Sequence, residues 1–70
     1  MAGRRNTRAA ILDAAVDLFG TWGVGATSLD DIAGTVGVAK QTLLYWFASK
    51  DELLDAVLEQ TAIELATIIE

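Results

Sequence analysis

The 70-residue sequence contains no cysteine, no histidine and no proline. Without cysteine there can be no disulfide, and without cysteine or histidine the usual zinc-ligand sets are excluded. The absence of proline agrees with nearly continuous helix, because proline interrupts helices. No apolar run approaches the roughly 20 residues that a membrane span needs. The first ten residues, MAGRRNTRAA, lack the apolar stretch of a secretory signal, so we expect a cytoplasmic protein with no membrane contact.

Basic residues are also few, and the net charge of −5 argues at first against a nucleic-acid partner. The distribution of the charges matters more than their sum. Three of the five basic residues lie within the first eight positions, and six of the ten acids lie in the last twenty. Because salt screens exposed charges beyond about 8–10 Å, an acidic far end does not prevent a basic near end from meeting phosphate. Residues 1–6 are either a flexible basic arm that lies along DNA or a solvated tail.

A chain of this length forms one small domain, and its apolar periodicity predicts helices. We expect a first helix from about Thr7 to Thr21, capped by Asn6 or Thr7 and ended by Gly23. Its apolar face carries Phe19 and Trp22, both expected in the core. The full face is Ile11, Leu12, Ala15, Leu18, Phe19 and Trp22.

The segment Ser28–Phe47, SLDDIAGTVGVAKQTLLYWF, predicts two short helices on either side of a glycine. Ser28 and Asp31 have the spacing of a capping box, and Gly37 can adopt the left-handed conformation that ends a helix. The second helix begins with polar residues, and its apolar positions are Leu43, Leu44 and Phe47. This outline is typical of a helix-turn-helix, whose second helix enters the major groove of DNA.

Two positions next to these helices suggest contact with phosphate. Thr27 and Ser28 open a helix, where hydroxyls and free amides can bind an anion, although capping alone would explain both. Ser49 and Glu52 form a second capping box, at the start of a fourth helix. Lys50 then lies at the positive end of that helix dipole, which is better explained if an anion sits opposite it.

The fourth helix should run from Lys50 to near the end of the chain. We expect its apolar stripe at Leu54, Val57, Leu58, Thr61, Ala62, Leu65, Ile68 and Ile69. A helix of about 20 residues is roughly 30 Å long, which is more than a three-helix head can cover. We therefore expect the stripe beyond Thr61 to be uncovered in this chain, and the chain to be a fragment or to pair with a second copy.

From about Arg8 to Leu58 the sequence resembles the N-terminal DNA-binding domain of TetR-type transcriptional regulators. The resemblance is carried by AAILDAAVDLF, Gly23, ATSLDDIAGTVGVAKQTLLYWF and SKDELLDAV. It implies an all-α, homeodomain-like fold: a tri-helical head over residues 7–48, and a fourth helix over 49–70. In such proteins that helix leads to a larger domain, absent here, that dimerises and binds a small-molecule effector.

The resemblance also assigns residues to DNA. It places Lys40, Gln41 and Thr42 at base-facing or groove-facing positions, and Tyr45 and Trp46 at phosphate. Thr27 and Lys50 match phosphate contacts from the flanking helices. The full set of expected DNA-binding residues is Thr27, Ser28, Ala39, Lys40, Gln41, Thr42, Leu44, Tyr45, Trp46 and Lys50.

The sequence departs from the family at three of these positions. Leu44 replaces a tyrosine that touches DNA, so it can only contact an apolar group or turn inward. Trp46 replaces a histidine or tyrosine and keeps one N–H donor. Ala39 replaces the serine that caps the recognition helix. Gln41 can pair with adenine, and Lys40 can donate to guanine or to phosphate; both could also be ordinary solvated residues.

We therefore expect a sequence-specific regulator of a double-stranded operator, most simply a homodimeric repressor that an effector releases. The alternative is a helical protein-interaction module that uses the uncovered stripe of the fourth helix. An enzyme is disfavoured, because catalysis would have to rest on scattered surface acids, and we expect neither a cofactor nor a metal.

Overall fold

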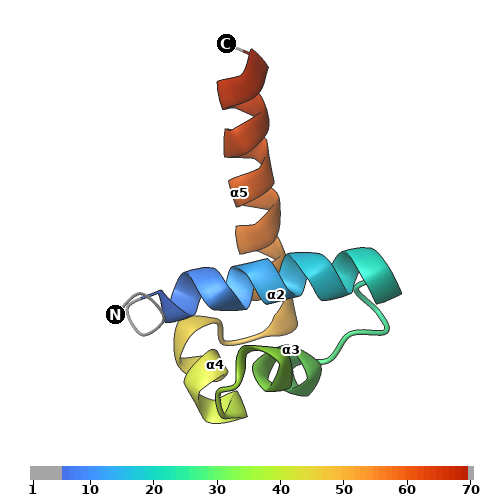
Figure 1. Ribbon diagram of the computed structural model, residues 1–70, viewed down its shortest axis with the longest axis vertical. Helices are drawn as coiled ribbons and strands as arrows, with labels where there is room; N and C mark the ends of the chain where they lie inside the picture. Colours follow the sequence, from blue (N-terminus) through green and yellow to red (C-terminus); the bar gives the residue numbers. More distant parts are fainter. Residues whose placement is uncertain (1–5, 70) are drawn as a thin grey trace.

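The computed structural model describes the backbone of residues 6–69 and the side chains of residues 6–67. Four helices and no strand occur within this range (Figure 1). They are α2 (Thr7–Trp22), α3 (Leu29–Val36), α4 (Lys40–Trp46) and α5 (Lys50–Ile69). The predicted all-α fold is confirmed. Apart from Asn6, which precedes α2, the expected basic arm lies outside the described residues.

The helices form a head from which α5 projects. Helix α2 packs against α3 and against the first part of α5, and α3 packs against α4. In Figure 1, α3 and α4 lie on one side of α2 and α5 rises from the other side. The two helices of the helix-turn-helix are therefore at the opposite end of the molecule from the end of α5. None of the helices described is both long and apolar enough to cross a membrane.

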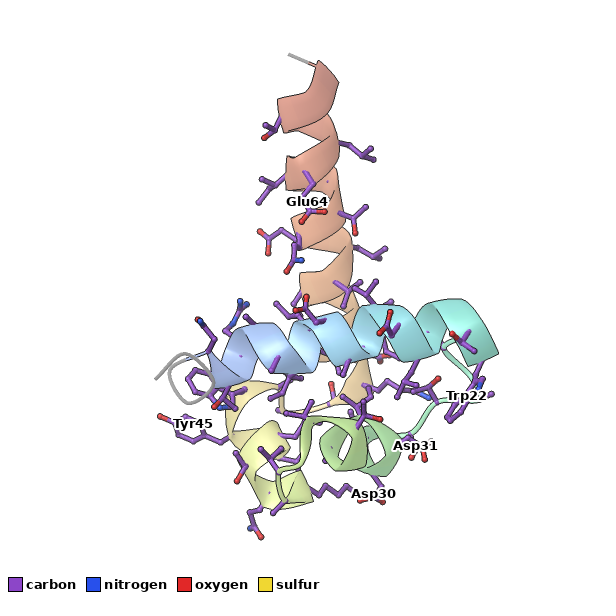
Figure 2. The ribbon with its side chains drawn as sticks, viewed as in Figure 1. Trp22, Asp30, Asp31, Tyr45 and Glu64 are labelled. Atoms are coloured by element: carbon purple, nitrogen blue, oxygen red, sulfur yellow. The ribbon has the colours of Figure 1, made fainter. Side chains whose placement is uncertain are left out.

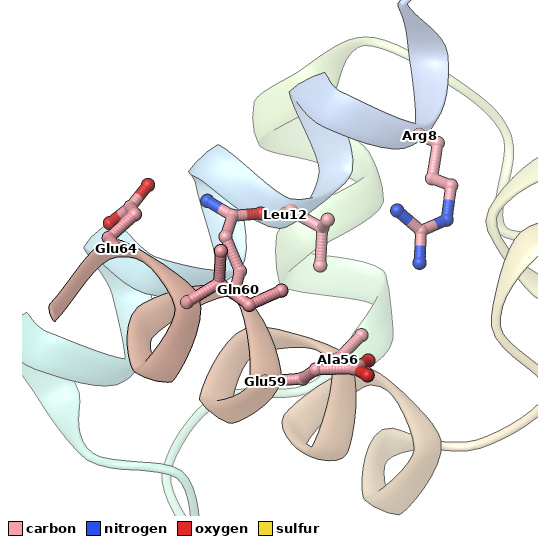
Figure 3. A pocket seen from close by; sticks show the side chains of 7 residues that line it. Arg8, Leu12, Ala56, Glu59, Gln60 and Glu64 are labelled. Carbon is pink, nitrogen blue, oxygen red and sulfur yellow. The ribbon is translucent and has the colours of Figure 1, made fainter. Parts of the chain in front are cut away.

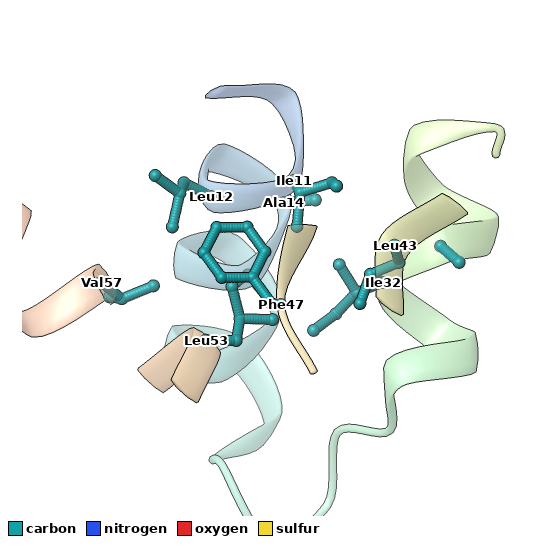
Figure 4. Close-up of a cluster of buried hydrophobic side chains, with 10 residues drawn as sticks. Ile11, Leu12, Ala14, Ile32, Leu43, Phe47, Leu53 and Val57 are labelled. Atoms are coloured by element: carbon teal, nitrogen blue, oxygen red, sulfur yellow. The ribbon is translucent and has the colours of Figure 1, made fainter. Parts of the chain in front are cut away.

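A small core holds the head together, and each helix contributes one large aliphatic side chain that is completely buried (Figure 4). Burying such a side chain stabilises a fold by about 1.5–3 kcal/mol, so the loss of any one of the four would weaken the contact between helices. The four residues are Ile11, Ile32, Leu43 and Leu53. Around them lie the buried Leu12, Ala14, Ala15, Ala33, Phe47 and Val57.

The predicted helix boundaries in the helix-turn-helix are confirmed. The Ser28 hydroxyl accepts a hydrogen bond from the Asp31 N–H, and Asp31 accepts one from the Ser28 N–H, both at 3.0 Å. Gly37 ends α3 with φ 90° and ψ 27°, a left-handed conformation that favours glycine. Val38 then packs against the core in the corner between α3 and α4.

The expectation that Trp22 lies in the core is wrong, because this residue is 53% exposed. It is the last residue of α2, and Gly23 turns the chain immediately after it with φ 91°. Figure 2 shows its ring at the end of the helix, beside the loop that leads to α3. Phe19, one turn earlier, is half-buried and packs against the core as expected.

The face of α5 that packs against the head also differs from the apolar face predicted from the sequence. Leu53 and Val57 are buried and Ala56 packs against the core, whereas Leu58 is 57% exposed. The reason is that α5 is apolar on more than one side, and its packing against α2 selects the face that carries 53, 56 and 57. Beyond Thr61 the expectation is confirmed, since Ala62 and Leu65 of the stripe are exposed. The side chains of residues 68 and 69 lie outside those described.

Candidate nucleic-acid interface

Helix α4 is fixed to the head by two buried side chains, Leu43 on the helix and Phe47 directly after it. The guanidinium carbon of Arg8, from the first turn of α2, lies 5.2 Å from the centre of the Phe47 ring. A cation over an aromatic face at this distance is attractive. The sequence analysis did not anticipate this contact, because the two residues are far apart in the chain. Together these contacts hold α4 in one orientation.

The rest of α4 is exposed, and it carries most of the residues expected to contact DNA. Tyr45 is 79% exposed, and Figure 2 shows its ring directed away from the head. The Tyr45 and Trp46 rings meet edge to face, with centroids 5.2 Å apart. Leu44 is 37% exposed, so it is not buried in the head and part of its side chain remains accessible on this face. The exposed set is completed by Lys40, Gln41 and Thr42.

The start of α4 has no side-chain cap. Ala39 is its N-cap residue, in extended conformation with φ −70° and ψ 152°, and no side chain accepts from the first amides. The Ala39 carbonyl accepts from the Thr42 and Leu43 N–H groups at 3.0 and 3.2 Å. Helix α4 is therefore less well capped than α3, whose first turn is closed by a capping box.

Lys40 is the first residue of α4, and an acidic side chain lies near its ammonium group. Its Nζ lies 3.6 Å from Oδ2 of Asp30, on the first turn of α3. The Lys40 side chain is 50% exposed and that of Asp30 70% exposed. An exposed ion pair of this kind contributes about 0–1 kcal/mol to stability. Lys40 is therefore free to turn towards a ligand at little cost to the fold.

At the start of α3, the capping box uses both the backbone N–H and the side-chain hydroxyl of Ser28. The Ser28 N–H and hydroxyl both hydrogen-bond with Asp31, and they lower the pKa of the Asp31 carboxyl, the N–H having the larger effect. The Ser28 side chain is exposed and its hydroxyl proton can still donate to an anion. Two carboxylates, Asp30 and Asp31, stand beside it and would repel a phosphate.

Thr27 lies inside the head, because its side chain is only 1% exposed. Its hydroxyl is 2.8 Å from the Gly23 carbonyl and 3.2 Å from that of Leu18. The hydroxyl thus ties the loop after α2 to the end of that helix. A phosphate contact from the Thr27 side chain, as the resemblance implied, does not fit this geometry.

Lys50 also has partners within the protein. Its Nζ donates to the backbone carbonyls of Val24 and Thr27, at 2.8 and 2.9 Å. These two carbonyls, rather than a phosphate, account for a cation at the start of α5. The ammonium group has a third N–H, which remains for an anion. Ser49 caps α5 by accepting from the Glu52 N–H, but Glu52 accepts from the N–H of Ala48 rather than of Ser49.

A shallow hollow lies elsewhere, between the first turn of α2 and the middle of α5 (Figure 3). It has an apolar floor and charged groups of both signs, and nothing in it resembles a nucleophile with a base. The residues that line it are Arg8, Leu12, Ala56, Glu59, Gln60, Ile63 and Glu64. In the part of the chain described, no three acidic side chains are grouped so that they could hold a metal ion.

Comparison with known proteins points to the same helix-turn-helix segment as the geometry does. Residues 11–57, more than half of the chain, match the family described as bacterial regulatory proteins of the tetR family. The HTH-type transcriptional regulator RutR of Escherichia coli K12 is 51% identical over 51 residues, 73% of this chain and 24% of RutR. The HTH-type transcriptional repressor Rv3405c of Mycobacterium tuberculosis H37Rv is 40% identical over 67 residues, 96% of this chain and 36% of that protein.

A third relative, the HTH-type transcriptional repressor KstR2 of Rhodococcus jostii RHA1, is 35% identical over 57 residues, 81% of this chain and 28% of KstR2. No solved structure matches the chain. The chain spans about a quarter to a third of the length of these relatives. Both the matched residues and the four-helix arrangement place it at the helix-turn-helix part of such proteins. The chain belongs to the tetR family of bacterial regulatory proteins.

Proposed function

We propose that this chain is the DNA-binding head of a transcriptional regulator, and that α4 enters the major groove of a double-stranded operator. The observation that carries the proposal is the exposed face of α4, held in place by the buried Leu43 and Phe47. The major groove of B-DNA is about 12 Å wide and admits a single helix. Among residues 6–69, no helix lies on the side of α4 that faces away from α2 and α5 (Figure 1).

The exposed side chains fall into two groups, those that can contact bases and those that can contact the phosphate backbone of DNA. The Gln41 amide can donate to N7 and accept from N6 of one adenine, and the Lys40 ammonium can donate to guanine O6 or N7. Thr42 can donate or accept through its hydroxyl. On the backbone, Tyr45 and Trp46 each offer a donor to phosphate, and Ser28 and the third N–H of Lys50 are the remaining candidates. Leu44, beside them, can pack on a thymine methyl group.

The whole protein is proposed to act as a homodimeric cytoplasmic repressor that a small-molecule effector releases from its operator. Support comes from two relatives that are named repressors, and from the exposed distal half of α5, which leads away from the head. Two copies would then read half-sites separated by about one helical turn of DNA, or a multiple of it.

The assignment is tested with Gln41→Ala and Tyr45→Phe in the full-length protein. Gln41→Ala should lose about 1–3 kcal/mol of discrimination at one base pair, because it removes a bidentate pair. Tyr45→Phe should weaken binding to all sequences alike, because a phosphate carries no sequence information. Both changes are on an exposed face, so neither should alter folding.

The measurement is fluorescence anisotropy with a duplex selected from random DNA and with each single-base-pair variant of that duplex. If Gln41→Ala lowered the affinity for every duplex equally, Gln41 would not be a base reader.

The second candidate is a protein-interaction module, and the observation in its favour is the group of exposed apolar side chains on α5, Leu58, Ile63 and Leu65. The two functions differ in their dependence on salt. DNA binding through phosphate contacts falls steeply as salt rises, whereas an apolar contact does not. Retention on DNA that disappears at moderate salt therefore supports the first function.

A further inference from the structure

The ion pair between Asp30 and Lys40 joins the first turns of the two helices of the helix-turn-helix. Its separation of 3.6 Å is within ion-pair range but too long for a strong charge-assisted hydrogen bond. The capping box of α3 is made by Ser28 and Asp31, so it does not need Asp30. An exposed pair also adds little to folding. The main effect of Asp30 is therefore on the charge that α4 presents to DNA.

Asp30 affects the two uses of Lys40 differently. Attraction between Lys40 and the phosphate backbone is long-ranged, and at about 8–10 Å the phosphates feel the sum of the two charges, which is nearly zero. A contact with a base edge is short-ranged and directional. The Lys40 ammonium has three N–H groups, so one can face Asp30 while two remain for O6 and N7 of a guanine.

From this geometry we propose that Asp30 is a positioning residue that raises sequence specificity through Lys40. It reduces the sequence-independent attraction of α4 to phosphate and leaves Lys40 able to read a guanine. Binding to the wrong sequence is thus weakened more than binding to the operator, which increases specificity. With only five basic residues in the chain, cancelling one of them changes a large share of its attraction to DNA. The inference rests on the proposed function.

The test replaces Asp30 with asparagine in the full-length protein and measures two affinities by fluorescence anisotropy, over about 50–300 mM salt. One probe is the duplex selected from random DNA, and the other is poly(dA-dT), which lacks the operator and has no guanine O6 or N7 for Lys40 to contact. Asp30→Asn should bind poly(dA-dT) about threefold to fivefold more tightly. The slope of log affinity against log salt should steepen by up to about one unit. The affinity for the selected duplex should change less, so the specificity ratio falls.

Glu64→Gln is the matched control, because it makes the same change from carboxylate to amide far from α4. Figure 2 shows Glu64 on the distal half of α5 and Asp30 beside α4, at the other end of the molecule. If Glu64→Gln altered the specificity ratio as much as Asp30→Asn, a general effect of net charge would replace the proposal. Circular dichroism of each variant, with melting temperatures within about 4 °C of the parent, shows that the fold is retained.

A second comparison tests whether Asp30 acts through Lys40. In a Lys40→Gln background, Asp30→Asn should leave the specificity ratio unchanged, because without the base contact of Lys40 the loss of the Asp30 charge raises both affinities alike. An equal fall in the ratio with and without Lys40 would overturn the inference. The proposed function is tested separately by the parent protein. It is supported if the parent prefers the selected duplex over poly(dA-dT), and fails if it does not, whatever Asp30→Asn does.

Discussion

The ammonium group of Lys50 ties the first turn of α5 to the loop between α2 and α3. It donates to the carbonyls of Val24 and Thr27, while the Thr27 hydroxyl donates to the carbonyl of Leu18 in α2. The loop that leads into α3 is therefore held from both sides. Because α3 in turn packs against α4, Lys50 acts on α4 through the fold. A loss of DNA affinity on replacing Lys50 would not by itself show a phosphate contact.

Replacing Lys50 with methionine should destabilise the head by about 1–3 kcal/mol, since two hydrogen bonds from a charged donor are lost and the methylene stem is kept. The free energy of unfolding is measured with urea and followed by circular dichroism. The control is Lys40→Met, the same chemical change at an exposed ion pair, which should cost less than about 1 kcal/mol. Equal losses in the two variants would mean that the hydrogen bonds of Lys50 do not stabilise the fold.

At the scale of the element, α3 and α4 differ in how their first turns are satisfied. Helix α3 has a reciprocal capping box, and the hydrogen bonds from Ser28 hold the pKa of Asp31 below its usual value of 3.8. Helix α4 begins at Ala39 with no side-chain acceptor and depends on the burial of Leu43 and Phe47. The two helices should therefore respond differently to acid, because only the start of α3 contains an ionisable cap.

The cap predicts how stability depends on pH. A carboxyl whose pKa is lower in the folded state contributes stability above its unfolded pKa, and this contribution is lost as the pH falls through the folded value. Between about pH 6 and pH 3, the parent protein should therefore lose more stability than an Asp31→Asn variant, which has no charge to lose. Urea unfolding across this range measures the difference. Parallel pH profiles would show that the Asp31 carboxylate adds nothing to the cap.

Helix ends could be predicted from the sequence because the residues that make them are close together in the chain. Ser28 and Asp31 are three residues apart, and Gly37 needs only its own conformational freedom. The inner face of α5 could not be predicted in this way, because Leu53 and Leu54 are both apolar and packing against α2 selects the first. The same limit applies to the site. The exposed face of α4 followed from its local pattern, whereas the partners of Lys50 lie 23 and 26 residues away.

At the scale of the whole molecule, α5 has two halves with different environments. Its first turns are buried against α2 through Leu53 and Val57, whereas Ile63 and Leu65 contribute exposed apolar surface. A helix without tertiary contacts is marginal in water, since packing supplies most of its stability. The first half of α5 therefore belongs to the head, and the second half depends on whatever packs against it in the full-length protein.

This difference should appear in amide hydrogen exchange of the 70-residue chain. Amides at residues 63–67 should exchange at least about tenfold faster than those at 53–57, because the side chains there are exposed and local opening breaks few tertiary contacts. In the full-length protein the two segments should be protected more equally. Uniform protection along α5 in the 70-residue chain, if it persisted on dilution, would contradict the expected difference between the two halves. Protection that falls on dilution would mean that two copies cover each other's exposed side chains, and light scattering would then show a dimer at the higher concentration.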